Sequence, residues 1–353
     1  MVKMINCIDR IPETIHHILK NSETNFKELR EHLKIQKNID EIIFVASGSS
    51  FNSAFVSKGF IEKITGIKVT LIYPNNFINY THIFNKNGLY IFISQGGGTK
   101  LVYESILKLK EMGIKSVSLT SDLDSKISCI SDIKLDMGCG YEEIIFRTVG
   151  YSSSLLICYL IGLNIALVYD KIDRKGYKNY LDKIKKIPSN ILEIINSTQI
   201  WYNINKKNML ENKKWIFIGA DDLWGTAQEA DIKVIETATY MTKSLELEEA
   251  IHGPQNGYKN DMNIFILLDK TKDLDKAKSI ARFCKEEVGN CFIFGDFKLD
   301  ETDFYFDSVG EEFKPLEYIT PFQVLCHLLA EDLNRDITKP IYTSLTKYIN
   351  KTL

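Results

Sequence analysis

The feature that most constrains the fold is an apolar run that breaks at a polar or glycine-containing turn and continues as a helical pattern. It occurs at residues 42–50 (IIFVASGSS), at residues 89–99 (LYIFISQGGGT) and at residues 215–222 (WIFIGADD). Continuous apolar runs of this length are typical of strands that are buried on both faces, as in parallel sheets covered by helices. The sequence therefore predicts an α/β protein built from strand–turn–helix units.

The remaining elements extend this pattern into two lobes of similar order. Further strands are expected at residues 69–73, 116–119, 133–135, 264–268, 291–294 and 304–306. Helices are expected at residues 11–19, 26–35, 51–61, 101–112, 274–288 and 322–333, the last one after the cap-then-proline pair Thr320-Pro321. The similar order of the two halves suggests an ancient duplication.

The predicted domains follow from this order and from the length of 353 residues, which is enough for two domains. We expect N-terminal helices in 1–40, a first parallel-sheet domain in 41–170, a helical connection in 171–212 and a second such domain in 213–353. Within the first domain, residues 152–168 (SSSLLICYLIGLNIALV) are nearly as apolar as a membrane span. Because Asn164 interrupts this segment and globular patterns flank it, a buried helix in the core or at a dimer interface is expected.

Composition excludes several classes of partner and cofactor. A formal net charge of −2, spread along the chain, gives no footprint for nucleic acid or for a membrane, so a small-molecule partner is expected. The seven cysteines form no C-x-x-C pair and mostly lie in apolar runs, which indicates reduced, buried thiols in a cytoplasmic protein without a signal peptide. No histidine has metal-ligand spacing, and no dinucleotide or triphosphate fingerprint is present, so neither a metal nor a cofactor is expected.

Hydroxyl groups and glycines gather after two strands of the first domain. The hydroxyls belong to Ser47, Ser49, Ser50, Ser94 and Thr99. Hydroxyls, free backbone N–H groups and a helix N-terminus at the carboxyl ends of parallel strands are what a phosphate group requires, although one such turn alone is often only turn chemistry. The matching turn of the second domain carries two aspartates, which would repel phosphate. One phosphate site per chain is therefore predicted, in the first domain.

A titratable stripe is predicted on the helix that starts near Gly225. Helical spacing places Glu229, Lys233, Glu236 and Tyr240 on one face, away from a core face formed by Ala227, Val234, Ile235 and Ala238. A second short helix is expected from about Ser244 and would end at His252-Gly253-Pro254. Considered alone, these features are more typical of a solvated ion pair and of a histidine at a helix end than of a catalytic site.

Taken in order, the motifs resemble the sugar isomerase (SIS) domain family, in particular the isomerase half of glucosamine-6-phosphate synthase and the fructosamine-6-phosphate deglycases. The matching pieces extend from Ile42 to the end of the chain. They are Ala46-Ser47-Gly48-Ser49-Ser50, Ile93-Ser94-Gln95-x-Gly97-x-Thr99, Thr148-x-Gly150-Tyr151, Gly225-Thr226-Ala227-x-Glu229, Lys233-x-x-Glu236 and His252-Gly253-Pro254. The resemblance implies two SIS lobes with flavodoxin-like, doubly wound sheets.

The resemblance also implies roles for individual residues. Ser49, Ser50, Ser94, Gln95 and Thr99 would bind the sugar phosphate, with weaker candidates in Ser47, Gly48, Gly96, Gly97 and Thr148. Glu236 would be the base that moves a proton between C1 and C2, with Lys233 in the same stripe. His252, supplied in the family by the neighbouring subunit, would help to open the sugar ring. This implies a homodimer whose active site is shared between subunits.

The chain departs from the family pattern at several positions. Gly96 and Gly98 replace a usual serine and a frequent glutamate of the phosphate loop, and Val149 replaces a common lysine. The family's C-terminal catalytic lysine has a candidate in Lys347, but the spacing differs by two residues and places Leu345 there. No glutaminase half is expected, because the chain starts Met1-Val2 without the required cysteine.

The resulting hypothesis is a phosphosugar isomerase or a ketosamine-6-phosphate deglycase. Both reactions would use the same base and an enediol or enolamine intermediate, so the sequence does not separate them. The alternative is a non-catalytic sugar-phosphate sensor, since SIS lobes also occur in regulators. The first forty residues are short and not basic enough for a DNA-binding helix-turn-helix domain, which favours the enzyme.

Overall fold

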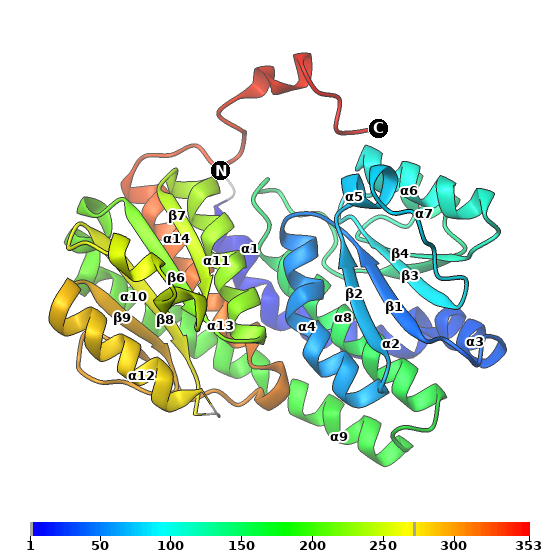
Figure 1. The fold of residues 1–353 in the computed structure, drawn as a ribbon, viewed down its shortest axis with the longest axis horizontal. Coiled ribbons are helices and arrows are strands. Elements are labelled where there is room, and N and C mark those ends of the chain that lie inside the picture. The colour runs from blue at the N-terminus through cyan, green and yellow to red at the C-terminus, as the bar shows by residue number, and fades with distance from the viewer. Residues whose placement is uncertain (1–2, 271–272) are drawn as a thin grey trace. The chain divides into compact units, whose positions relative to one another are not determined.

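The computed structural model describes residues 3–270 and 273–353, which fold into two compact units (Figure 1). The first unit consists of Glu13–Lys185 together with the C-terminal segment Lys339–Leu353. The second unit consists of the residues up to Pro12 together with Lys186–Thr338. These units divide the chain at other places than the predicted domains do, because both contain N-terminal residues and the end of the chain belongs to the first.

Each unit contains one parallel sheet of five strands. The first sheet consists of β1 (Glu41–Val45), β2 (Lys68–Ile72), β3 (Gly88–Ile93), β4 (Ser116–Thr120) and β5 (Ile133–Asp136), in the order β2-β1-β3-β4-β5. The second consists of β6 (Lys214–Gly219), β7 (Met241–Glu246), β8 (Met262–Leu268), β9 (Cys291–Gly295) and β10 (Phe304–Tyr305), in the order β10-β9-β8-β6-β7. With β6 in the place of β1, the two orders are the same. This flavodoxin-like order confirms the predicted two-lobed fold and its pseudo-duplication.

Helices cover both sheets. The first unit contains α2 (Ile11–Asn25, which begins in the second unit), α3 (Lys27–Ile35), α4 (Ser49–Thr65), α5 (Pro74–Asn79), α6 (Lys100–Glu111), α7 (Lys126–Ile130), α8 (Val149–Val168), α9 (Arg174–Ile184) and the 3-10 turn η5 (Thr343–Lys347). The second unit contains α1 (Met4–Asp9), α10 (Ile187–Glu211), α11 (Asp222–Ala238), α12 (Leu274–Phe283), α13 (Pro315–Tyr318) and α14 (Thr320–Asp332). It also contains the short turns η1 (Glu249–Ile251), η2 (Pro254–Gly257), η3 (Cys284–Val288) and η4 (Glu311–Phe313).

Strand β7 corrects one prediction. A short helix from about Ser244 is expected from the sequence, but Met241–Glu246 pair in parallel with Lys214–Gly219 of β6. The carboxylate of Asp231 on α11 fixes this strand by accepting the backbone N–H of Ser244 at 2.9 Å. As an edge strand with few buried residues, β7 lacks the apolar run that identifies the other strands. Only the single turn η1 precedes His252.

A second correction concerns the start of α14. Thr320 is the first residue of the helix rather than its cap, and its hydroxyl donates back to the carbonyl of Leu316 at 3.2 Å. The chain enters α14 directly from α13, so groups in the first turn of α14 can form hydrogen bonds to carbonyl groups of α13. A cap-then-proline pattern does not reveal such a continuation.

Helix α8 forms the centre of the first unit. It is long and apolar enough to cross a membrane by length and composition, but 89% of its most apolar window is buried within the protein. It packs along α4, where a β-carbon added at Gly162 would lie 2.9 Å from Cγ1 of Ile61. The buried amide of Asn164 donates to the carbonyl of Leu160 and accepts a hydrogen bond from Arg30. The predicted buried core helix is confirmed.

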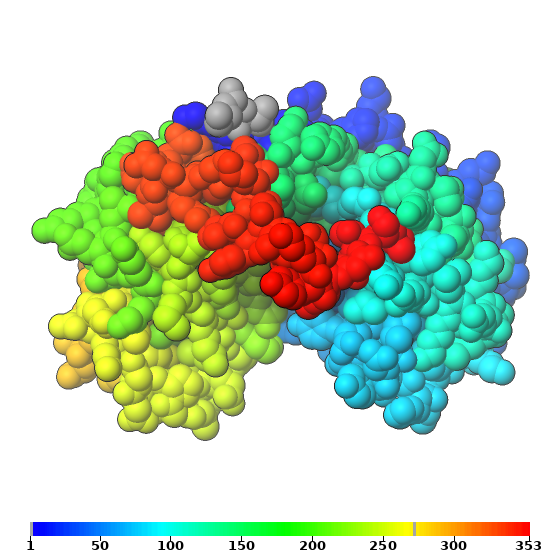
Figure 2. All heavy atoms as spheres, turned by 90° about the horizontal axis from the view of Figure 1, so that it is seen from above, coloured from blue at the N-terminus to red at the C-terminus, as the bar shows by residue number. Residues whose placement is uncertain are grey.

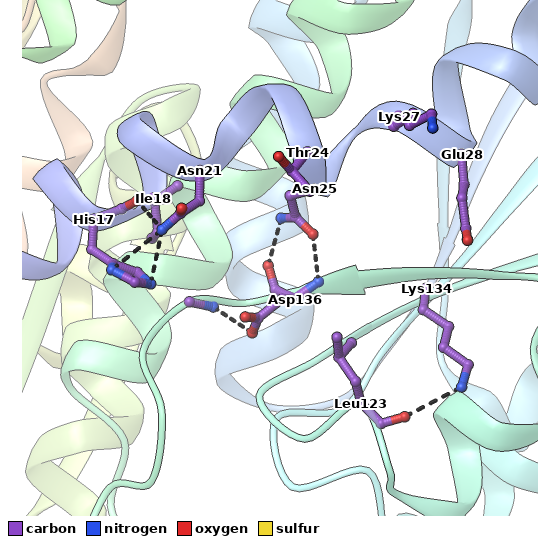
Figure 3. Close-up of a pocket in the computed structure, with 11 residues that line it drawn as sticks. His17, Ile18, Asn21, Thr24, Asn25, Lys27, Glu28, Leu123, Lys134 and Asp136 are labelled. Atoms are coloured by element: carbon purple, nitrogen blue, oxygen red, sulfur yellow. Dashed lines mark hydrogen bonds between the residues drawn. The ribbon is translucent and has the colours of Figure 1, made fainter.

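The outer edge of the first sheet is closed by a side chain rather than by another strand. The amide of Asn25 at the end of α2 donates to the carbonyl of Asp136 at 2.8 Å and accepts the N–H of the same residue at 2.9 Å (Figure 3). This pair reproduces the bonds that a neighbouring strand would make to β5. A cavity of about 530 Å³ lies beside it, lined by both lysines and carboxylates.

The cysteines agree with the prediction of reduced and mostly buried thiols. Within residues 3–270 and 273–353, no disulfide bond joins any of the seven cysteines; six are buried and Cys129 is exposed.

Candidate functional site

The predicted phosphate loops follow the two central strands of the first unit. Strands β1 and β3 are neighbours, with Val45 paired to Phe92 near their carboxyl ends. Helix α4 begins at Ser49 after Gly48, whose φ of 58° favours glycine, and α6 begins after Thr99. The chain reverses direction across the sheet between these strands, which is where doubly wound folds bind ligands. The first N–H groups of α4 and α6 therefore point toward the same end of the sheet.

Some of the contacts that hold the loop Ser94–Thr99 lie within the loop itself. The hydroxyls of Ser94 and Thr99 lie 2.8 Å apart, and the N–H of Gly97 donates to the carbonyl of Ser94 at 2.9 Å. Gly97 has φ of 59°, and a β-carbon there would lie 2.0 Å from the hydroxyl oxygen of Ser125, so this position requires glycine. At Gly96, by contrast, a β-carbon would meet open space. The loop thus carries two hydroxyl groups on a glycine-rich backbone.

The C-terminal residues of the chain pair with this loop. Thr352 forms an antiparallel bridge with Thr99, in which Leu353 N–H donates to the Gly98 carbonyl at 2.9 Å and Lys100 N–H donates to the Lys351 carbonyl at 3.1 Å. Figure 2 shows the red C-terminal residues against the cyan part of the first unit. Lys347 lies in the exposed turn η5 of this segment. The tail that carries Lys347 is thereby tied to the predicted phosphate loop.

Two predicted ligands, Gln95 and Thr148, are joined through a third residue. The side-chain N–H of Gln95 donates to Glu142 at 3.0 Å, and both the N–H and the hydroxyl of Thr148 donate to the other oxygen of Glu142. Glu142 is buried, with 3% of its surface exposed. The structure therefore brings Ser94, Gln95 and Thr99 together in one loop and connects Thr148 to it through a carboxylate.

The titratable stripe of α11 is buried, which corrects a prediction. Glu229 is 0% exposed and Lys233 is 1% exposed, whereas Ile235, which was assigned to the core face, is 46% exposed. Ala227, Val234 and Ala238 are buried as predicted. Helix α11 packs on β6 and β7 and also on α14, so its buried arc is wider than a single face and includes the stripe.

Lys233 connects the two carboxylates of this stripe. Its ammonium contacts the carboxylate of Glu236 and lies 3.6 Å from that of Glu229. Burial alone would lower the pKa of Lys233, but the two carboxylates more than offset this effect and hold the pKa above its ordinary value. The side chain of Glu236 is 33% exposed. The lysine is therefore a buried cation that orients a carboxylate reachable from solvent.

His252 is exposed and oriented by the turn that precedes it. Its side chain is 59% exposed, and Nδ1 lies 2.9 Å from the backbone carbonyl of Glu248. A carbonyl oxygen can only accept, so Nδ1 is the donor in this contact and Nε2 remains for another hydrogen bond. Glu248 itself pairs with Lys276, a contact that lowers the pKa of the Glu248 carboxyl.

At the switch point of the second sheet the chemistry is acidic. A cavity of about 360 Å³ there is lined by Asp221, Asp222, Asp269 and Lys314, among others. The ammonium of Lys314 lies 2.5 Å from Asp269 and 3.6 Å from Asp222. Asp221 has φ of 51°, close to the 58° of Gly48, so the two turns share a conformation but differ in charge. The aspartates favour placing an anion in the first unit.

The partly buried carboxyl of Asp222, whose side chain is 23% exposed, predicts a pH effect on stability. Burial raises the pKa of this carboxyl from 3.8 to about 6, with Lys314 opposing the rise and Asp221 and Asp269 adding to it. Because the folded state holds the proton more tightly, stability is lost as pH rises from about 4 through about 6. Urea unfolding should show that Asp222→Asn removes this loss, which is on the order of 2 kcal/mol. The exposed control Asp275→Asn should keep it, and equal pH profiles for Asp222→Asn and the wild type would contradict the assignment.

Two residues of the sites receive no role from the sequence: Glu229, which is named only as part of the stripe and of a motif, and Glu142, which is not named. Glu229 stands four residues before Lys233, a spacing that signals an ion pair, but its complete burial is not visible in the sequence. Glu142 lies in an irregular loop with no periodic pattern, so no sequence signal marks it. Both contact residues that the sequence does assign to a site: Glu229 pairs with Lys233, and Glu142 accepts a hydrogen bond from Gln95.

The fold and the motifs were compared with those of known proteins. Residues 35–163 match the family model of the SIS domain. This part of the chain is therefore similar to the SIS domain.

The chain is also similar to proteins of known name over nearly its whole length. The chain is 27% identical over 347 residues to glutamine–fructose-6-phosphate aminotransferase [isomerizing] of Wigglesworthia glossinidia brevipalpis, covering 93% of this chain and 55% of the relative. It is also 27% identical over 328 residues to the protein of the same name from Thermotoga maritima, covering 91% of this chain and 54% of that relative. The chain thus spans about half the length of these relatives and is homologous to their isomerase part.

Solved structures agree on the fold. A candidate phosphosugar isomerase of Clostridium difficile 630 superposes with a TM-score of 0.92 at 24% identity, covering 99% of both chains. The C-terminal domain of glucosamine-fructose-6-phosphate aminotransferase from Francisella tularensis superposes with a TM-score of 0.87 at 20% identity, covering 96% of this chain and 97% of that one.

Proposed function

We propose that the protein is a phosphosugar isomerase or a ketosamine-6-phosphate deglycase that acts on a hexose 6-phosphate or an amino-sugar 6-phosphate. The observation that carries this proposal is the α11 stripe, in which the buried ammonium of Lys233 holds the half-exposed carboxylate of Glu236. A buried ion pair is costly to maintain and seldom adds stability, so one placed beside a reachable carboxylate is a candidate for catalysis.

Glu236 is the proposed general base. Its carboxylate removes the proton from the carbon next to the substrate carbonyl, which leaves an enediol or enolamine, and returns the proton to the neighbouring carbon. The sugar must first be in its open form. His252 serves this step because Nε2 of its neutral ring can accept the proton of the anomeric hydroxyl. Lys233 keeps the Glu236 carboxylate in place throughout.

The phosphate is assigned to the first unit. Ser49 and Ser50 begin α4, and Ser94 and Thr99 bring two hydroxyls within 2.8 Å of each other at the start of α6. These groups supply the hydroxyl and N–H donors that a phosphate dianion requires. Gly96 contributes no hydroxyl, so backbone N–H groups replace it. The remaining candidate, Lys347, is exposed on the tail that pairs with this loop.

Turnover of a substrate panel tests the proposal. The purified protein is incubated with fructose 6-phosphate, glucose 6-phosphate, glucosamine 6-phosphate and a fructosamine 6-phosphate, and the products are separated and quantified. Aldose–ketose conversion assigns the isomerase branch, and release of glucose 6-phosphate with a free amine assigns the deglycase branch. Binding of a sugar phosphate without any conversion would contradict the proposal and identify a sensor.

We further propose a homodimer in which His252 acts in the partner's site, since this histidine is exposed and held by contacts within its own turn. Glu236→Gln and His252→Ala chains should each be inactive alone. After they are mixed and allowed to exchange subunits, hybrid dimers should regain up to about half of the wild-type activity per dimer, because one of the two sites has both residues intact. Activity that stays absent after proven exchange would show that both residues act within one chain.

A further inference from the structure

The Glu142 carboxylate accepts four hydrogen bonds from neighbouring parts of the chain. Oε1 accepts the N–H of Thr148 at 2.7 Å and its hydroxyl at 2.8 Å, while Oε2 accepts the N–H of Gly150 at 3.1 Å and the side-chain N–H of Gln95 at 3.0 Å. A carboxylate has about four acceptor positions, and all four are used here. Glu142 is therefore not free to take a proton from a substrate. Its carboxylate also occupies the N-terminus of α8, which excludes a phosphate from that helix end.

The Gln95 side chain lies flat against the first turn of α8. A β-carbon built at Gly150 would lie 2.0 Å from Oε1 of Gln95 and 2.2 Å from its Cδ and Nε2. The amide therefore occupies space that any other residue at position 150 would fill. Glu142 thus bonds the amide on one side, and Gly150 leaves room for it on the other. We call these two residues the amide seat.

The backbone of Gln95 is fixed as well. Its carbonyl accepts the N–H of Ser121 at 2.8 Å and the Ser121 hydroxyl at 2.7 Å, beyond the end of β4. The residue thus connects the end of β4 to the start of α8, and the loop Ser94–Thr99 begins at this connection. Gly96 and Gly98 follow it, and neither has a side chain that could anchor the loop. The Gln95 side chain is the link between this loop and α8.

We propose that Glu142 is a positioning residue that acts through Gln95: its buried carboxylate holds the Gln95 amide on Gly150 and thereby sets the shape of the phosphate-binding loop Ser94–Thr99. The phosphate part of this inference rests on the proposed function. The effect on the loop itself does not, because it concerns contacts within the first unit alone. Glu142 contacts no substrate in this scheme.

Two variants disturb the amide seat in different ways. Glu142→Gln keeps the shape but places an amide NH₂ where two donors now bond, and it removes charge-assisted hydrogen bonds. Gly150→Ala keeps the carboxylate and forces the Gln95 amide away, while alanine suits a helix better than glycine, so this variant should fold. Glu143→Gln changes the adjacent exposed glutamate and is the matched control.

Hydrogen exchange of the peptide covering residues 94–99 is the ligand-independent readout. We expect about tenfold faster exchange there in both Glu142→Gln and Gly150→Ala, with the peptides of β6 and β8 and the Glu143→Gln control unchanged. Faster exchange in Glu142→Gln alone would show that Glu142 does not act through Gln95. Unchanged exchange in Glu142→Gln would overturn the positioning role altogether.

Titration with inorganic phosphate tests the link to the ligand. The dissociation constant should rise about tenfold in both variants, and it should be the same for the control and the wild type. A faster-exchanging loop with an unchanged dissociation constant would overturn the ligand part of the inference. If the wild type itself binds neither phosphate nor any sugar phosphate, the proposed function fails, and the exchange experiment still decides the role of Glu142.

Discussion

Replacing Glu236 with glutamine should lower kcat by about 10²–10⁴-fold on the substrate that the wild type converts, because the amide cannot remove a proton from carbon. The substitution preserves shape, and the glutamine oxygen can still accept the hydrogen bond of Lys233. The dissociation constant for the sugar phosphate should therefore remain within about twofold of the wild-type value, since Glu236 is not among the proposed phosphate donors. Steady-state kinetics and a direct binding titration measure the two quantities separately.

The matched control is Glu211→Gln on α10, where the glutamate is exposed and paired only loosely with Lys207 at 3.9 Å. This variant should keep the wild-type kcat, because exposed ion pairs of this kind contribute little. Wild-type turnover by Glu236→Gln would remove the general base from the proposed mechanism. A parallel loss in kcat and in binding would show that Glu236 supports the fold instead.

Replacing Lys233 with methionine should destabilise the second unit by about 3–5 kcal/mol, because the buried carboxylate of Glu229 loses its ammonium. Methionine retains most of the volume and the flexible stem, so the loss reflects charge rather than a cavity. Urea unfolding with a probe in the second unit, such as the fluorescence of buried Trp215, measures the change. Turnover should also fall, since the Glu236 carboxylate loses its orientation.

Removing the negative charge of Glu229 as well tests this explanation. The double variant Lys233→Met with Glu229→Gln should recover part of the lost stability, because a neutral amide is less costly to bury than a carboxylate whose ammonium has been removed. Lys276→Met, which breaks the exposed contact with Glu248, should leave stability unchanged. Additive losses in the double variant would mean that Glu229 and Lys233 do not stabilise each other.

The sequence is sufficient for the fold wherever a strand is buried on both faces. Residues 42–46 and 89–93 have continuous apolar runs and form β1 and β3. It is insufficient for β7, a half-exposed edge strand whose place is set by pairing with β6 and by the Asp231 carboxylate. It also does not reveal that Lys339–Leu353 returns to the first unit, because Thr352 and Thr99 meet only through the tertiary fold.

For the site residues too, the sequence predicts some features of the structure and not others. Spacing alone places Lys233 and Glu236 on one helix face, as the structure has them, but a single-face amphipathic pattern puts that face in solvent. The stripe is buried because α14 covers α11 from a second side, which the local sequence does not encode. Glu142 is invisible for a related reason, since its four hydrogen bonds come from Gln95, Thr148 and Gly150, which meet only after folding. Their roles toward substrate remain predictions.

Proton exchange with solvent tests the proton-transfer mechanism most directly. The protein is placed in heavy water with fructose 6-phosphate, glucose 6-phosphate and glucosamine 6-phosphate, and proton NMR follows the signals at C1 and C2. A base that moves a proton through an enediol should replace the C1 or C2 proton of at least one substrate with deuterium, and Glu236→Gln should abolish this loss of signal. Saturable binding across the panel with no exchange at either carbon would contradict the enzymatic function and favour a sugar-phosphate sensor.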